Sequence, residues 1–404
     1  MKSKLTYLNT GTSGQMPSAV QESLRVHYER YANNPTAAGE DEENTLGLFQ
    51  EINREKLSKV FSVPIETLVI TGNTTMGLHL AINGLEFPEG TEIVTSLHEH
   101  ITLLSPLWVT ENRNCGVKVV KIDIPEQPKN ENEVVRSIET QIKPSTKLVC
   151  ISHVNWSNGM RLPVSAICQR MRELGVKTIV DGAHSAGMIK LNLSEIGADF
   201  YVGSGHKWFN GPPGTGFLYI NPLIGNVNPF WVTLSQWESM RTLRGWPKSI
   251  PASIQYRGQT NTPAMAAFAD AIDIHESIGQ KNIEDKALKL SQMLKLCIVN
   301  EWGDEALLSP SPNVSSEFHS GITSFIPSSD LSKAYDRSFI EKVVKKLRER
   351  HNIWGRTVRF SRSLADLSDG NTTYGVRFCT HYLNSEEEVL DSFNKTVEEA
   401  SDCY

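Results

Sequence analysis

Short hydrophobic runs alternate with helical stretches between residues 66 and 220. The runs are bounded by polar or Gly-rich residues, as buried strands are. In chain order they are TLVIT, TEIVTS, GVKVVKIDI, KLVCISHV, KTIVD, DFYVGS and GTGFLYI, with helices expected through MGLHLAINGL and AICQRMRELG. This alternation predicts βαβ units and a mainly parallel sheet, and therefore an α/β fold.

The pattern changes from Thr262 onward, where long helical stretches mix with a few strands. Helices are expected through TPAMAAFADAIDIHESIG, NIEDKALKLSQMLKLCIVNE, IEKVVKKLRERHN and the C-terminal segment, and strands at GITSFI, TVRFS and YGVRFCT. We therefore predict an N-terminal arm over residues 1–20, a large domain over 21–261 and a small α+β domain over 262–404. Segment 222–261, rich in Trp, Pro and Gly, is expected to form loops between the domains or between subunits.

Composition narrows the class of function. The 404 residues carry 40 Lys and Arg against 46 Asp and Glu, a net charge of -6, so no basic field favours nucleic acid or an anionic membrane. The six cysteines form no CxxC pair and no Cys/His ligand spacing, which disfavours disulfides and a metal site. The N-terminus turns polar within ten residues and no apolar run is long enough to span a bilayer, so we expect a cytoplasmic enzyme of small-molecule chemistry.

Polar residues follow two of the predicted strands at the edge where ligands bind in such sheets. Asp181 ends the strand KTIVD, and Lys207 comes shortly after DFYVGS in the segment SGHK. A plain ion pair is the commoner interpretation of a Lys and an Asp at neighbouring strand ends. Pyridoxal phosphate gives the pair a sharper role, because a Lys forms its Schiff base and an Asp keeps the pyridine nitrogen protonated.

Three further groups carry weaker signals. The segment TGNTT, residues 71–75, lies between a strand and a helix and is either a phosphate cradle or a capped helix start. His100 ends another strand region, where it stacks on a planar cofactor or serves as a hydrogen-bonded structural residue. Arg356, with Arg359 and Arg377 nearby, suits the carboxylate of an amino acid, although surface arginines are common.

The order of these motifs resembles a known family. The segments TGNTTMG, the EH that follows IVTS, SHVNWSNGMRLPV, DGAHSAG and SGHKWFNGPPGTGFLYI resemble the class V aminotransferases, which are fold-type I pyridoxal-phosphate enzymes. That family includes cysteine desulfurases, isopenicillin-N-epimerase-like proteins, kynureninase-like enzymes and C–S lyases. The resemblance is dense over residues 65–220 and thinner toward the C-terminus. It implies the fold-type I transferase fold, pyridoxal 5'-phosphate as cofactor and a homodimer with active sites at the interface.

The resemblance also implies roles for individual residues. Lys207 corresponds to the Schiff-base lysine, Asp181 to the partner of the pyridine nitrogen and His100 to the residue stacked on the ring, with His184 beside Asp181. The phosphate-binding residues that it implies are Thr74, Thr75, Ser204 and His206. The family usually adds a Gly-Thr from the other subunit. Here the segment reads Gly258-Gln259-Thr260, so either Gln259 or Thr260 is expected to reach the phosphate.

Two departures from the family pattern narrow the reaction. Cysteine desulfurases need a nucleophilic Cys just after the substrate-binding Arg, but Arg356 is followed by TVRFSRSLADLSDG, which holds none. Cys379 lies in a strand, where core packing is the expected role, so persulfide chemistry is disfavoured. Trp156 stands where desulfurases have an Asn over the ring. The H-V-x-W form resembles the branch with isopenicillin N epimerase-like proteins and cysteine or cystine C–S lyases, in which Asn155 or Asn158 would reach the ring hydroxyl.

The N-terminal segment YLNTGTSG resembles the arm of the same branch, which folds over the active site. Asn9 and Thr10 are therefore expected to meet the substrate, and turn or cap formation is the alternative. Arg356 follows the I-x-x-R spacing of the family and is expected to bind the α-carboxylate.

The sequence thus predicts an enzyme that acts on an amino acid. Lys207, freed by the substrate amine, takes the α-proton, and elimination at Cβ or Cγ follows, with or without cyclisation. An aminotransferase or an epimerase on the same site is the alternative, so the protein is a lyase or a transferase. A non-catalytic scaffold or pyridoxal-phosphate-binding regulator is disfavoured because Lys207 and Asp181 are both present.

Overall fold

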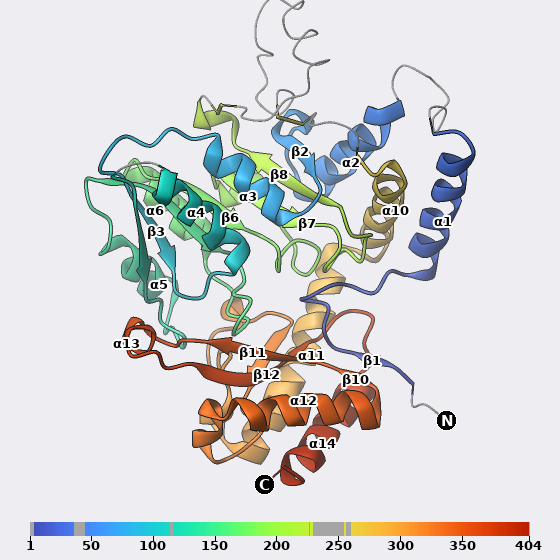
Figure 1. Cartoon of the computed structure of the whole chain (residues 1–404), viewed down its shortest axis with the longest axis vertical. Coiled ribbons are helices and arrows are strands. Elements are labelled where there is room, and N and C mark those ends of the chain that lie inside the picture. Colours follow the sequence, from blue (N-terminus) through green and yellow to red (C-terminus); the bar gives the residue numbers. More distant parts are fainter. Residues whose placement is uncertain are drawn as a thin grey trace, which may run out of the picture.

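The computed structural model has a large part built around one sheet and a smaller part of helices and three strands (Figure 1). It describes residues 4–35, 45–113, 116–225, 227–228, 254–255 and 260–403. Within them, no helix is both long and apolar enough to cross a membrane.

The large part is organised by a seven-stranded sheet with the order β2-β8-β7-β6-β5-β3-β4. β8 is antiparallel to both its neighbours, and the remaining strands run in one direction, which confirms the mainly parallel sheet that the sequence predicts. The strands are β2 (Leu68–Thr71), β3 (Glu92–Ser96), β4 (Lys118–Ile122), β5 (Thr146–Ser152), β6 (Lys177–Asp181), β7 (Phe200–Ser204) and β8 (Gly216–Ile220).

Both faces of this sheet are covered by helices. Successive residues of a strand point to opposite faces, and Leu148 accordingly packs in the cluster with α3 and α4 while Val149 packs in the cluster with α2, α5, α6 and α10. A double-sided core explains why the strands read as continuous apolar runs. The helices are α2 (Thr45–Phe61), α3 (Thr74–Asn83), α4 (Ile101–Arg113), α5 (Glu131–Glu139), α6 (Val164–Glu173), the short α7 (Leu193–Ile196) and α10 (Thr262–Ile278).

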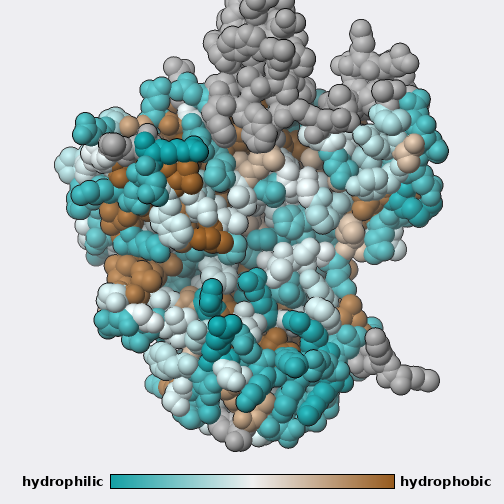
Figure 2. Space-filling view, viewed as in Figure 1, coloured by the Kyte–Doolittle hydropathy of each residue, from teal (hydrophilic) through white to brown (hydrophobic). Residues whose placement is uncertain are grey.

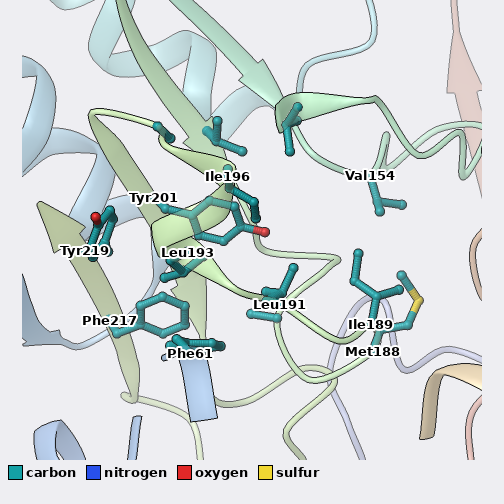
Figure 3. Close-up of a cluster of buried hydrophobic side chains, with 14 of the residues drawn as sticks. Phe61, Val154, Met188, Ile189, Leu191, Leu193, Ile196, Tyr201, Phe217 and Tyr219 are labelled. Atoms are coloured by element: carbon teal, nitrogen blue, oxygen red, sulfur yellow. The ribbon is translucent and has the colours of Figure 1, made fainter. Parts of the chain in front are cut away.

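Figure 3 shows part of the cluster that contains Val149, where aromatic rings contact aliphatic side chains under the sheet. Phe61 and Phe217 lie with ring centroids 4.7 Å apart. Tyr201 projects from β7 into the same core, where it lies near Leu191 and Leu193 of the segment that follows β6 (Figure 3). This packing holds β6 and β7 side by side, and these two strands carry the candidate chemistry.

The small part is a three-stranded antiparallel sheet, in the order β11-β12-β9, backed by helices. In α12, Phe339, Ile340, Val343 and Leu347 are buried, whereas Figure 2 shows a mainly hydrophilic surface on the side of α12 that faces the viewer. The elements are α11 (Gln280–Trp302), β9 (Ile322–Phe325), α12 (Arg337–His351), β10 (Ile353–Trp354), β11 (Arg356–Phe360), α13 (Leu364–Ser368), β12 (Thr373–Cys379) and α14 (Glu386–Ser401).

The N-terminal arm joins the two parts. Its strand β1 (Thr6–Tyr7) pairs in parallel with β10 of the small part, and the chain then runs past the loop after β7 before α1 (Ser18–Asn33) begins. The Gly14 N–H donates to the His206 carbonyl oxygen over 2.7 Å. A Cβ on Gly14 would overlap the Lys207 carbonyl oxygen, so this approach requires glycine.

The domain boundaries expected at residues 20 and 261 stay a prediction. α10 packs against α1 and α2, and its Met265 and Phe268 belong to the core under the seven-stranded sheet. This packing favours a boundary nearer the start of α11 than at Thr262. Most of segment 222–261, for which loops are expected, lies outside the described residues.

Candidate active site

Asp181 and Lys207 come to the same edge of the sheet because β6 and β7 are paired neighbours. Asp181 is the last residue of β6, is buried, and accepts a hydrogen bond from the Ala183 N–H over 2.8 Å. Gly182 permits the turn, since a Cβ there would overlap the Tyr201 ring. Burial raises the pKa of Asp181, whereas the Ala183 bond and the Lys207 ammonium lower it.

The Lys207 amine has an unusually low affinity for protons. Burial, together with the charges of Arg377 and Arg356, lowers its pKa from 10.5 to about 8, and the charge of Asp181 opposes the shift. A lysine near this value is largely unprotonated in mildly basic solution, which makes its nitrogen available as a nucleophile and as a base.

His184 lies directly beside that amine. Its Nε2 is 3.5 Å from Lys207 Nζ, and its Nδ1 accepts a hydrogen bond from the indole N–H of Trp208 over 3.4 Å. Burial and the charge of Lys207 hold the pKa of His184 well below its usual value. A neutral His184 that accepts from Trp208 carries its proton on Nε2, the nitrogen that faces Lys207.

His100 is placed by the buried residue before it. Glu99 accepts hydrogen bonds from the hydroxyls of Ser96 and Ser152, which ties the turn after β3 to β5, and burial raises its pKa to about 7. His100 Nδ1 lies 3.3 Å from the backbone N–H of Thr102, from which it accepts a hydrogen bond. Burial and the charges of Lys207, Arg356 and Arg377 lower its pKa to about 4. The ring is therefore neutral and lies within electrostatic reach of these three cations.

The residues expected to bind phosphate include three with unused polar atoms. Thr74 Oγ1 at the start of α3, Ser204 Oγ at the end of β7 and His206 Nδ1 are buried and have no hydrogen-bond partner among the described residues. Buried polar atoms are rarely left unpaired, and a bound anion satisfies such a set together with the N–H groups of a helix start. Thr75 follows in the same first turn and is half-buried.

The structure describes one of the two residues that the sequence offers for the other subunit's phosphate site. Thr260 accepts a hydrogen bond from the Gln50 side chain over 3.2 Å within its own chain. Gln259 lies outside the described residues.

Two arginines meet at one hydroxyl of the N-terminal arm. Arg356 and Arg377 face each other across the β11–β12 pair, and each donates to Thr12 Oγ1 over 3.3 Å. Arg377 is 1% exposed and also donates to the Trp156 carbonyl oxygen over 2.8 Å, and its Nε has no partner among the described residues. Arg356 is exposed at the mouth of this site. Together they form a strong site for a carboxylate.

Arg359, the third arginine of the sequence motif, does not share that hydroxyl. It is exposed on β11 and lines a cavity with Arg356. The geometry therefore separates Arg359 from the pair at Thr12.

The two arm residues expected to meet substrate form the turn that presents Thr12. The Thr12 hydroxyl donates to Asn9 Oδ1 over 2.8 Å, and Asn9 bridges to Cys379 of β12. Thr10 is buried, and a Cβ on Gly11 would press on Cys379 Sγ and approach His184. Asn9 thus stabilises a turn, which is the alternative interpretation of this residue. Its contact with substrate stays a prediction.

The segment around Trp156 connects the ring site to the arginines. The Trp156 ring lies edge-on to His100, with centroids 5.4 Å apart. Asn155 Oδ1 and Asn158 Nδ2 are both buried without a partner in the described chain, so each retains an atom for a ligand. Which of them reaches the ring hydroxyl stays a prediction.

Cys379 is a free, fully buried thiol at the end of β12. Its neighbours include Gly11 of the arm, so it packs under the turn rather than on a loop beside the substrate. In the small part, His351, Glu398 and Glu399 come within metal-ligand distance of one another. Glu399 there is already ion-paired with Arg350 and hydrogen-bonded to His351.

The comparison with family models identifies the family of this chain. Residues 6–324 match the model described as Aminotransferase class-V, which spans the sheet, Asp181 and Lys207. The chain belongs to the class V aminotransferase family. The resemblance that the sequence motifs suggest is thereby confirmed.

Relatives of known name fall in the expected branch of this family. Isopenicillin N epimerase of Streptomyces clavuligerus is 28% identical over 76% of this chain and 78% of its own. A probable cysteine desulfurase of Methanothermobacter thermautotrophicus is 27% identical over 97% of this chain and 94% of its own. A solved complex of the cystine C–S lyase C-DES with cysteine persulfide superposes with a TM-score of 0.81, 25% identity and 98% coverage of each chain.

The cofactor of this class V enzyme is pyridoxal phosphate, which is covalently linked to glycine in a solved mutant of C-DES with a TM-score of 0.81 and 25% identity over 98% of this chain and 97% of that one. The site described above fits it on chemical grounds. The unpaired atoms of Thr74, Ser204 and His206 suit the phosphate, and buried Asp181 suits the pyridine nitrogen. The amine of Lys207 is positioned for covalent attachment. The fold-type I α/β fold is likewise confirmed.

Sequence reasoning missed two residues of the site. Thr12 lies one turn from the predicted Asn9 and Thr10, and only the strand register shows that it meets the two arginines. Trp208 follows Lys207 directly and reads as an ordinary core residue, yet its indole fixes the tautomer of His184. No local signal distinguishes either residue from its neighbours.

Proposed function

We propose that this class V enzyme removes the α-proton of an amino acid and then expels a leaving group from Cβ or Cγ, with or without cyclisation of the product. The observation that carries the proposal is the Lys207 amine, with a pKa lowered to about 8, beside Asp181 and the arginine pair. The same residues serve every reaction of Cα deprotonation. The choice of elimination rests on the features below.

Pyridoxal phosphate, when bound, supplies an electron sink for the electron pair left at Cα. Asp181 supports this by holding a proton on the pyridine nitrogen, and its bond to Ala183 fixes the carboxylate in place. Thr74, Thr75, Ser204 and His206 would hold the phosphate. His100, neutral and unable to repel a cationic ring, is suited to stacking.

Lys207 Nζ takes the proton from Cα. Its lowered pKa leaves a substantial fraction of neutral amine near pH 8, and the proton on His184 Nε2 keeps that histidine from competing as a base. Arg377 and Arg356 bind the α-carboxylate and thereby orient the Cα–H bond toward Lys207.

Elimination is favoured over sulfur transfer to the enzyme. The loop after β11, residues 361–372, contains no cysteine, and Cys379 is buried in β12. A nucleophilic thiol is therefore missing from the position where the desulfurase reaction needs one. Likeness to the C–S lyase C-DES supports the same choice.

Epimerisation is the second candidate, supported by the 28% identity to isopenicillin N epimerase. It shares every step up to deprotonation and then returns a proton to Cα. Aminotransfer, the other alternative, requires a 2-oxo acid acceptor.

The test is an assay of the holoenzyme with amino acids that carry good leaving groups at Cβ or Cγ. Elimination releases ammonia and a 2-oxo acid, or a cyclic amino acid, without an added acceptor. The same samples in deuterated water report epimerisation as exchange at Cα with loss of optical purity. Lys207→Ala is the null control for each reaction. Turnover only with a 2-oxo acid acceptor, or exchange without release of products, would refute elimination.

We further propose a homodimer in the cytoplasm. Segment 258–260 corresponds to the part of the family that reaches the other subunit's phosphate site, and the net charge of -6 offers no general attraction to an anionic membrane surface. Light scattering should give twice the 45.1 kDa of the chain. A monomer that binds cofactor and turns over substrate would contradict the dimer.

A further inference from the structure

A cavity of about 480 Å³ opens beside the arginine pair, at the edge of the small sheet. His100 and Trp156 of the candidate active site line it, and so does Arg356, which also meets Thr12. The cavity is therefore continuous with the place proposed for the α-carboxylate. A substrate bound there has room for a long side chain.

The walls of this cavity differ in character. Ile101, at the start of α4, is 52% exposed and forms an apolar wall together with the Trp156 ring. A polar part of the lining comes from β11, the edge strand of its sheet, with Thr357 and Arg359. Such an arrangement suits an aliphatic chain that ends in a polar group.

The lining of the cavity includes Glu341 and one arginine that has no partner among the described residues. Arg359 forms no hydrogen bond or ion pair within the described part of the chain, although Tyr374 lies opposite it on β12. Arg337 also lines the cavity, but its Nε donates to Glu341 over 2.8 Å. Arg359 is thus the cation that a ligand would satisfy, and guanidinium prefers carboxylate or another planar anion.

The spacing of the two arginines defines the ligand. Arg359 follows Arg356 by three positions of extended strand, so their Cα atoms lie about 10 Å apart. Their side chains leave opposite faces of β11, and because β11 is the edge strand both reach the cavity around that edge. Their long side chains shorten or extend that span by several ångströms. A molecule with two anionic groups joined by about four to six methylenes reaches both.

We propose that the amino-acid substrate carries a second anionic group at the end of its side chain, and that Arg359 binds this group. The inference rests on the proposed function, because it places the α-carboxylate at Arg356 and Arg377. It assigns Arg359 as a specificity residue that selects long, acidic substrates over short or apolar ones.

The test uses simple carboxylates, so that it does not depend on the reaction type. Calorimetric titration of the holoenzyme with adipate and suberate is compared with titration by hexanoate and octanoate, which have the same chain and one carboxylate. We expect the dicarboxylates to bind about tenfold more tightly, as for one added charged hydrogen-bonded contact in a partly open site. Arg359→Gln should bring the ratio of dicarboxylate to monocarboxylate affinity near one, and Arg359→Lys should retain part of the dicarboxylate preference.

Arg136→Gln is the matched control, because Arg136 is an exposed arginine on α5 outside the cavity. It should keep the wild-type ratio. Equal binding of mono- and dicarboxylates by the wild type, or a ratio unchanged in Arg359→Gln, would overturn the proposal. Failure of the proposed function has a different signature, since the carboxylates would still bind while no tested amino acid releases a 2-oxo acid or a ring.

Discussion

Replacing Arg377 with Lys should cost more activity than the same change at Arg356. The sequence favours Arg356 through its spacing, but Arg377 is the buried member of the pair. Its guanidinium reaches both the Trp156 carbonyl oxygen and Thr12 Oγ1, whereas Arg356 reaches only Thr12. Lys keeps the charge and loses the planar fork that makes both contacts at once.

The size of the loss follows from these contacts. A hydrogen bond to a charged group contributes about 1.5–3 kcal/mol. Lys keeps one of the two bonds that the Arg377 fork offers a carboxylate, so the loss of the other bond together with misorientation of the substrate should cost about 3–4 kcal/mol. That energy corresponds to a fall in kcat/KM of roughly 10²–10³-fold, at about 1.4 kcal/mol per tenfold. Arg356 is exposed and its charge is screened by solvent, so Arg356→Lys should lower kcat/KM by only about 5–30-fold.

A carboxylate-free amine separates binding from a structural role. Titration of the cofactor absorbance gives the affinity of each variant for an amino acid and for the matching amine without the carboxylate. We expect Arg377→Lys to lower the affinity for the amino acid and to leave the affinity for the amine unchanged. An equal loss of affinity for both ligands would show that Arg377 has a structural role. A larger loss of affinity for the amino acid in Arg356→Lys would show that Arg356 is the main carboxylate-binding residue.

Three other outcomes are expected. The purified protein should be yellow, and borohydride should bleach it and fix the cofactor to Lys207, whereas Lys207→Ala should lose its cofactor on reduction and dialysis. In apoprotein, capture of pyridoxal phosphate should quicken as pH rises through about 8, because the pKa of Lys207 is lowered to that value. A midpoint near 10 would contradict the burial of this amine. Asp181→Asn should bind cofactor yet lose most activity, since an amide cannot hold the pyridine proton, and turnover at the wild-type rate would make Asp181 structural. Burial lowers the pKa of His275 to about 3. As pH falls below 6.5 the unfolded state takes up the proton first, so stability measured by urea unfolding should drop by about 2 kcal/mol from this residue between pH 7 and 5, and His275→Phe should remove that part.

Much of the large domain was predictable because its signals are local. The inner strands are mostly apolar runs followed by polar residues, while the edge strand β4 also carries two Lys, and the seven-stranded sheet confirms all seven predicted strands. Asp181 and Lys207 could be placed at one edge because parallel neighbours end together. The sequence reached these residues without knowledge of any distant contact.

Other elements depend on interactions that a local pattern does not reveal. α4 contains Pro106, which removes a backbone donor and hides the helix in the sequence. β1 has two residues and exists only because β10 pairs with it from the far end of the chain. The choice between Arg356 and Arg377 likewise depends on the register of β11 with β12, which sets them face to face.

The N-terminal arm shows why the site is assembled from three distant segments. Thr12 holds Arg356 and Arg377 of the small part, while Gly14 two residues later rests on the loop that carries Lys207. The arm therefore ties the arginine pair to the loop of Lys207. If the pair binds the substrate carboxylate as we propose, that carboxylate competes with the Thr12 hydroxyl for the same guanidinium groups, and substrate binding is then expected to act directly on the element that links the two parts.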